Sequence, residues 1–159
     1  MLWYFMRHAE AEDTSPDGDR GRKLTERGQE RTRASALGLR KLDLQVDLIL
    51  TSPLVRAVET AEIVANVLEA PVEQEPLLGS GFDLEGLAEI AERLDKSNSV
   101  MLVGHEPDFS EVIGDFIGDG SVEMKKGAVA CVQALGIAAG AGTLLWLMNS
   151  KQTGLIGEK

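Results

Sequence analysis

The chain has 159 residues, of which 43% are hydrophobic and 26% charged, and this composition fits a single globular domain covering residues 1–159. Its formal net charge of −10 would repel nucleic acid and anionic membranes, so we exclude both as partners. No stretch approaches the roughly 20 apolar residues of a membrane span, and the N-terminus lacks the features of a signal peptide. Because Cys131 is the only cysteine, we expect a cytoplasmic protein without disulfides.

The hydrophobic pattern predicts strands that alternate with helices over most of the chain. The expected elements, in chain order, are a strand at 2–6, a helix at 25–41, a strand at 47–51, a helix with an apolar stripe over 57–68, a strand at 72–75, a helix at 84–94, a strand at 99–103, a helix at 109–117, and strands at 128–134 and 143–148. The two late strands are closely connected and are expected to pair antiparallel at a sheet edge. The polar tail from Lys151 is expected to be loose.

This alternation predicts an α/β fold with three layers, α/β/α, in which a mainly parallel sheet with an antiparallel edge strand carries helices on both faces. In such sheets ligands bind beyond the carboxyl ends of the strands. Several polar residues follow predicted strands: Arg7 and His8 after the first, Ser52 and Arg56 after the second, and His105 after the fourth. Both histidines of the chain are in this set, so we expect one site built from these side chains.

These side chains suit phosphoryl transfer. An imidazole is neutral over much of the physiological range and nucleophilic at one nitrogen, so it can accept a phosphoryl group and release it again. Two guanidinium groups can hold phosphoryl oxygens in bidentate fashion and keep the phosphorus in line with the nucleophile. Arginines would repel a metal ion, and the sequence has no HExxH motif or cysteine ligand set, so we expect no metal and no cofactor.

Four sequence blocks resemble, in order and spacing, the signatures of the histidine phosphatase superfamily, in the branch that includes the phosphoglycerate mutases. The blocks are Phe5–Ala9, Leu24–Gly28, Ser52–Ala61 and Val103–Pro107. The short chain and the block Lys125–Ala128 are similar to the small SixA-type phosphohistidine phosphatases. The resemblance implies a phosphoglycerate mutase-like fold and a metal-independent phosphohydrolase activity.

The resemblance also implies a role for each residue at the strand ends. His8 becomes the transient phosphohistidine. Arg7, Arg56 and His105 bind the phosphoryl group, His105 as a cation or a hydrogen-bond donor. Ser52 either donates to the phosphoryl group or only ends its strand, and we include it among the substrate-binding residues.

Other residues of these blocks are assigned structural roles. Thr25 and Gly28 are expected to cap the first helix and to permit close packing. Lys125 and Lys126 are expected to form a solvated turn rather than a contact with substrate.

One departure from the family pattern bears on the substrate. Larger relatives that hydrolyse phosphomonoesters have a Glu or Asp after the third strand, whereas Gly79–Gly81 occupy that region here, with Glu75 and Asp83 as nearby substitutes. An alkoxide leaving group needs a general acid, but an imidazole can leave once solvent has protonated it. The missing acid and the missing lid insertions therefore favour phosphohistidine, in a signalling or phosphotransfer protein, as the substrate.

Three other functions would make different demands on the sequence. A small phosphomonoesterase acting on a metabolite would need an acid from Glu75, Asp83 or the loop 10–13. A non-catalytic phosphate- or phosphoprotein-binding module would have no need for the nucleophile His8. A nucleotide-binding domain would carry a glycine-rich loop after the first strand, which this sequence lacks. We expect the protein to be a monomer.

Overall fold

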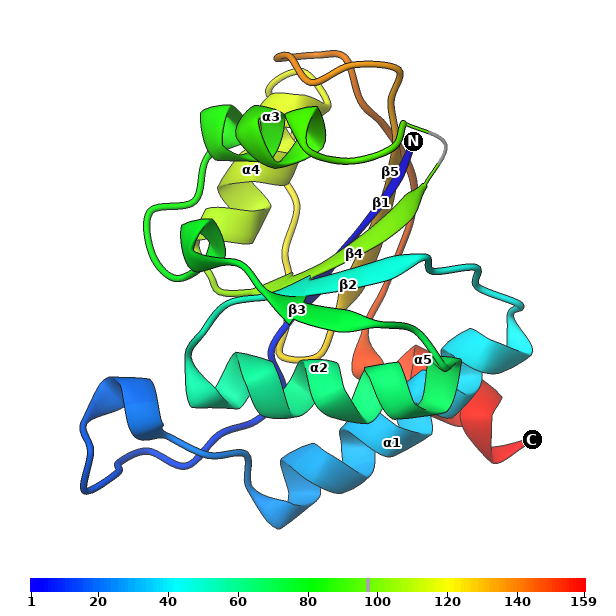
Figure 1. The fold of residues 1–159 in the computed structure, drawn as a ribbon. Helices are drawn as coiled ribbons and strands as arrows, with labels where there is room; N and C mark the ends of the chain where they lie inside the picture. The colour runs from blue at the N-terminus through cyan, green and yellow to red at the C-terminus, as the bar shows by residue number, and fades with distance from the viewer. Residues whose placement is uncertain (97) are drawn as a thin grey trace.

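The computed structural model describes residues 1–96 and 98–159, and these residues form a six-stranded sheet with helices on both faces (Figure 1). The order of the strands in the sheet is β3-β2-β4-β1-β5-β6. Their bounds are β1 (Leu2–Arg7), β2 (Leu48–Thr51), β3 (Val72–Gln74), β4 (Ser99–Gly104), β5 (Val129–Gln133) and β6 (Thr143–Met148).

The directions of the strands confirm the predicted fold class. β1, β2, β3 and β4 pair in parallel, while β5 pairs antiparallel with β1 and β6 pairs antiparallel with β5. The two late strands therefore lie together at one edge of the sheet, as predicted. β6 is the edge strand, and β5 is the strand that runs opposite to its neighbours.

Alternate residues of β1 face two separate hydrophobic cores. Trp3 and Phe5 pack under α3 (Leu84–Glu92) and α4 (Asp108–Phe116), whereas Tyr4 and Met6 pack under α1 (Glu26–Lys41) and α2 (Val55–Leu68). Figure 1 shows these helix pairs on opposite faces of the sheet. Across the described residues, no helix is both long and apolar enough to traverse a bilayer.

The start of α1 has the structural roles that the sequence predicts. The Thr25 side chain accepts a hydrogen bond from the Gly28 backbone N–H at 2.9 Å and so caps the helix. A Cβ at Gly28 would lie 2.2 Å from the carbonyl oxygen of Glu10, so this position requires glycine for close packing. The loop after β1 is thereby held against the first turn of α1.

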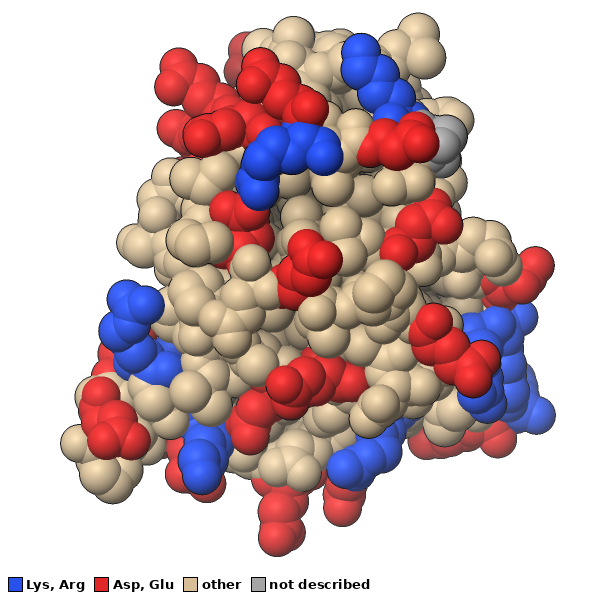
Figure 2. Space-filling view, viewed as in Figure 1, with Lys and Arg blue, Asp and Glu red and all other residues tan. Residues whose placement is uncertain are grey.

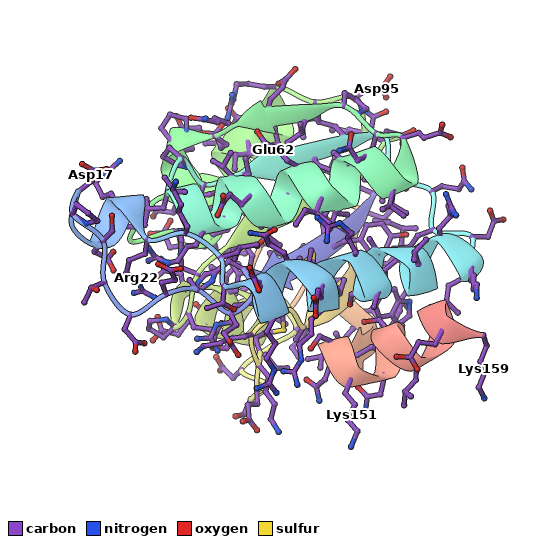
Figure 3. The ribbon with its side chains drawn as sticks, turned by 90° about the horizontal axis from the view of Figure 1, so that it is seen from below. Asp17, Arg22, Glu62, Asp95, Lys151 and Lys159 are labelled. Carbon is purple, nitrogen blue, oxygen red and sulfur yellow. The ribbon has the colours of Figure 1, made fainter. Side chains whose placement is uncertain are left out.

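The C-terminal segment is a helix, and the prediction of a loose tail from Lys151 is wrong. α5 (Ser150–Glu158) lies along α1, as Figures 1 and 3 show, with the Thr153 side chain fully buried. A Cβ at Gly38 would lie 1.9 Å from the Thr153 carbonyl oxygen, so the two backbones are in direct contact. Small residues make this contact, and they give no hydrophobic stripe from which to predict the helix.

The contact between α1 and α5 predicts the effect of adding one methyl group. Gly38→Ala should lower the free energy of unfolding by about 1–3 kcal/mol, because overpacking outweighs the better helix propensity of alanine. Gly136→Ala is the matched control, because no heavy atom lies within 4 Å of the added Cβ. Urea denaturation measures both, and equal stability of the two variants would show that α5 does not pack this closely on α1.

Candidate active site

The site lies where the carboxyl ends of three neighbouring parallel strands meet. The backbone N–H of His8, directly after β1, donates to the Gly104 carbonyl at the end of β4 at 3.0 Å. The backbone N–H of Ser52, directly after β2, donates to the Val103 carbonyl at 3.0 Å. These hydrogen bonds extend the sheet by one residue and bring His8, Ser52 and His105 to one edge.

The two imidazole rings are tilted against each other, with their centroids 5.3 Å apart and their planes at 53°. Nδ1 of His8 lies 2.8 Å from the carbonyl oxygen of Ala9. A carbonyl oxygen can only accept, so we assign the ring proton to Nδ1. Nε2 of His8 then carries the lone pair, and it accepts a hydrogen bond from Nε of Arg56 at 3.3 Å.

Burial keeps both rings uncharged. It lowers the pKa of His8 to about 3, with further lowering by His105, Arg56 and Arg7, although the hydrogen bond to the Ala9 carbonyl opposes the shift. Burial and the nearby Arg56 likewise lower the pKa of His105 to about 4. At neutral pH, His8 is therefore a neutral ring with a free electron pair on Nε2.

Ser52 and His105 form a pair. Nε2 of His105 lies 2.7 Å from Oγ of the fully buried Ser52, which also accepts a hydrogen bond from the backbone N–H of Leu54 at 3.2 Å. Among the described residues, no atom hydrogen-bonds to the buried Nδ1 of His105. Ser52 therefore orients the His105 ring, whichever atom donates.

Arg7 is fixed by the backbone on the far side of the site. Its Nη1 donates to the Met124 carbonyl at 3.0 Å, while its buried Nε has no hydrogen-bond partner in the described part of the chain. Burial lowers the pKa of Arg7, and the negative charge of Glu106 opposes this shift. The guanidinium group thus keeps a donor that no described protein group uses.

Arg56 is held by Asp19, a residue that the sequence reasoning missed. Nη1 of Arg56 donates to the Asp19 backbone carbonyl at 2.9 Å, and Nη2 donates to Oδ2 of Asp19 at 3.3 Å. The Asp19 side chain is 63% exposed and also pairs with Arg22 at 2.9 Å. It belongs to the projecting loop between β1 and α1, on which Figure 3 labels Asp17 and Arg22.

No spacing in the sequence links Asp19 to Arg56, because the loop that carries it has several acidic residues and no periodicity. Desolvation raises the pKa of the Asp19 carboxyl group. Its interactions with Arg56 and Arg22 lower the pKa by more, so the net shift is downward. The ionised carboxylate of Asp19 is therefore hydrogen-bonded to Arg56, one of the two arginines of the site.

Three of the carboxylates that the sequence offers as general acids have structural contacts instead. Glu75 accepts hydrogen bonds from the Leu77 backbone N–H at 3.1 Å and from Nη2 of Arg93 at 2.6 Å. Asp83 caps α3 by accepting from the Gly86 backbone N–H at 2.9 Å. Glu10, in the loop after β1, accepts from the Thr25 hydroxyl at 3.0 Å.

Metal ligands do not converge at the site. Within residues 1–96 and 98–159, no three His, Cys, Asp or Glu side chains form a group that could hold a metal ion. The groups at the strand ends are two neutral imidazoles, two guanidinium groups and one hydroxyl. This donor set is suited to an anion with several oxygens.

Comparison with known proteins places these features in a family context. The family model of the histidine phosphatase superfamily (branch 1) matches residues 3–107. An uncharacterised protein from Picosynechococcus sp. is 40% identical over 118 residues, which cover 70% of each chain. The structure of the protein histidine phosphatase SixA complexed with tungstate has a TM-score of 0.85 at 26% identity, covering 96% of this chain and 99% of that one. The alpha-ribazole phosphatase from Shigella flexneri shares the fold, with a TM-score of 0.69 at 20% identity over 94% of this chain and 97% of that one.

The lowered pKa of His105 predicts a loss of stability in acid. In the unfolded chain His105 takes up a proton near its ordinary value of 6.5, whereas the folded chain resists protonation until about pH 4. The contribution of His105 to the free energy of unfolding is therefore fully present above pH 6.5 and is lost as the pH falls toward 4. Between pH 7 and pH 5 His105 should account for a loss of about 2 kcal/mol, which His105→Gln should remove, whereas the loss that comes from His8 should remain.

Urea denaturation in phosphate-free buffer at the two pH values measures this effect. Ser52→Ala is the control, because it removes the hydrogen bond to His105 but leaves the ring to titrate. An equally steep loss of stability in His105→Gln and in the unmodified chain would contradict the assignment.

Proposed function

The chain belongs to the histidine phosphatase superfamily (branch 1) and is a phosphatase, and from this premise we propose that it hydrolyses phosphohistidine in a protein substrate through a phosphoryl intermediate on His8. The observation that carries the proposal is the state of the His8 ring. Its Nδ1 proton is fixed on the Ala9 carbonyl, and its Nε2 lone pair lies beside the guanidinium group of Arg56. The nucleophilic atom and an oxyanion-binding group are therefore adjacent before any substrate arrives.

The proposed reaction has two displacements. In the first, Nε2 of His8 forms a bond to phosphorus while the bond from phosphorus to the substrate imidazole breaks, and the departing ring takes a proton from solvent. In the second, a water molecule attacks the phosphorus on His8, and the products are inorganic phosphate and the regenerated ring. Arg7 and Arg56 hold the phosphoryl oxygens during both steps, and Ser52 and His105 complete the contacts. No metal or cofactor takes part in either step.

The contacts of Glu75 and Asp83 support phosphohistidine as the substrate. Each carboxylate caps a helix, so neither is available to protonate an alkoxide leaving group. A phosphoramidate does not require such an acid, because its imidazole leaves as a neutral ring after protonation by solvent. The similarity to SixA, at 26% identity over nearly the whole chain, points in the same direction.

A small phosphomonoesterase is the second candidate. The similarity to the alpha-ribazole phosphatase from Shigella flexneri favours it. Within the site, Asp19 is the exposed carboxylate that contacts Arg56, so it would be the first group to examine as a proton donor. Arg56 and Arg22 lower the pKa of Asp19, so its carboxyl group is ionised near neutral pH and has no proton to donate to a leaving group.

The proposal predicts a covalent intermediate on His8. A rapid quench with labelled phosphohistidine peptide should trap an acid-labile phosphoryl adduct on the unmodified chain and none on His8→Asn. The reaction is run in EDTA, because no step uses a metal. An adduct on His8→Asn, full turnover by that variant, or loss of activity in EDTA that zinc or magnesium restores would each contradict the mechanism. Binding of phosphate without turnover would instead indicate a binding module.

The missing acid predicts a large preference among substrate classes. The kcat/KM for a phosphohistidine peptide should exceed that for phosphoserine or a sugar phosphate by at least about 100-fold, because general acid catalysis contributes about 10²–10⁴-fold. Aryl phosphates should fall between the two. Glu75→Gln and Asp83→Asn should leave phosphohistidine hydrolysis nearly unchanged. Rapid hydrolysis of a sugar phosphate that either variant abolishes would favour the phosphomonoesterase.

A further inference from the structure

A groove lies along α5. It has a volume of about 730 Å³ and is lined by α1, by the turn that precedes β5 and by α5. Arg7 is the residue of the candidate site that lines it. We call this surface the basic groove because its other charged lining residues are four cations and one carboxylate: Arg31, Lys125, Lys126, Lys151 and Glu158.

The charge of the basic groove is opposite to that of the molecule. The chain has 26 Asp and Glu residues against 16 Lys and Arg residues, and Figure 2 shows acidic side chains spread over the face seen in Figure 1. The ion pairs between described residues use Arg22, Arg56 and Arg93, and none uses a cation of the groove. The four lysine and arginine side chains named in the groove besides Arg7 are therefore not engaged in these ion pairs.

Hydrogen bonds with Arg7 hold the turn that carries two of the groove lysines, Lys125 and Lys126. Nη1 of Arg7 donates to the Met124 carbonyl at 3.0 Å, and the Arg7 carbonyl accepts from the backbone N–H of Gly127 at 3.1 Å. Between these two contacts the chain turns, with the Ala128 N–H donating to the Lys125 carbonyl at 2.8 Å. The backbone that carries the exposed side chains of Lys125 and Lys126 is thus fixed by the same arginine that is proposed to bind the phosphoryl group.

The length of the basic groove exceeds what a small phosphate ester would fill. Lys151, Leu155 and Glu158 line it along α5, a span of about 10 Å at 1.5 Å per residue. Figure 3 shows Lys151 projecting from the start of this helix. Leu155 is 51% exposed and adds an apolar contact beyond the cations. A mixture of charged and apolar contacts over this length suits the surface of a protein.

We propose that the basic groove docks acidic side chains of the phosphorylated protein substrate, next to its phosphohistidine. The inference rests on the proposed function and adds the chemistry of the partner's surface. An acidic partner would be repelled by most of this molecule and attracted to the groove, so the groove orients it with the phosphoryl group toward Arg7. Lys125 and Lys126 then contact the substrate, in contrast to the solvated turn expected from the sequence.

Two phosphohistidine peptides of equal length test the proposal, one flanked by glutamates and the other by glutamines. The acidic peptide should have a KM roughly tenfold lower, because several individually weak exposed ion pairs act together. A variant with three substitutions in the groove should lose this preference: Lys125→Gln, Lys126→Gln and Lys151→Gln. A control with three exposed cations removed elsewhere should keep it: Arg33→Gln, Arg40→Gln and Lys96→Gln. All three proteins should hydrolyse free phosphohistidine at the same rate.

Fluorescence anisotropy with a labelled acidic peptide that lacks phosphate separates docking from catalysis. One outcome is that the unmodified chain binds this peptide, the groove variant does not, and neither protein hydrolyses phosphohistidine. This outcome would support docking and contradict the proposed function. Hydrolysis of both peptides with equal KM, or equal losses in the groove variant and the control, would overturn the docking proposal alone. Groove-dependent binding of pyrophosphate with no binding of the acidic peptide would also overturn it and assign the groove to a small polyanion.

Discussion

The site depends on how two imidazole rings remain neutral beside two guanidinium groups. Burial disfavours charge on either ring, and the arginines add repulsion against a further proton, so the pKa values of both histidines fall far below neutrality. The guanidinium groups keep their charge because their own pKa is so high. The result is a cationic pocket that contains an uncharged imidazole, which is proposed to be the nucleophile. Phosphoryl transfer to nitrogen requires this combination, since a protonated ring could bind a phosphoryl group but could not attack it.

The backbone of the sheet places these groups, and for that reason much of the site could be predicted from the sequence. His8, Ser52 and His105 each follow a strand directly, so short apolar runs in the sequence were enough to place them at one edge. Arg56 lies in the first turn of α2, shortly after Ser52, and could be placed in the same way. The geometry that prepares the His8 ring, including the carbonyl of Ala9, depends on loop conformation and has no signal in the residue pattern.

Two features could not be predicted from the sequence, each for a different physical reason. α5 packs through Gly38 and the backbone of Thr153, and close contact between small residues stabilises a helix without an apolar stripe. Asp19 is one of several acidic residues in a loop, and only the folded chain shows that it contacts Arg56. The carboxylates at 75 and 83 could be identified as candidates from the sequence, but their capping contacts became clear only when the helices that they start were known.

The contact between Asp19 and Arg56 has a consequence for the rate at which product leaves. A buried guanidinium group that loses its anion must be solvated again or find another partner. Asp19 can supply that partner as inorganic phosphate departs, because its exposed carboxylate and its backbone carbonyl accept from both Nη atoms. Binding and release then become exchanges of one anion for another, with a smaller difference in free energy between the filled and empty states. For the proposed hydrolysis, this exchange would weaken inhibition by the phosphate that accumulates as the reaction proceeds.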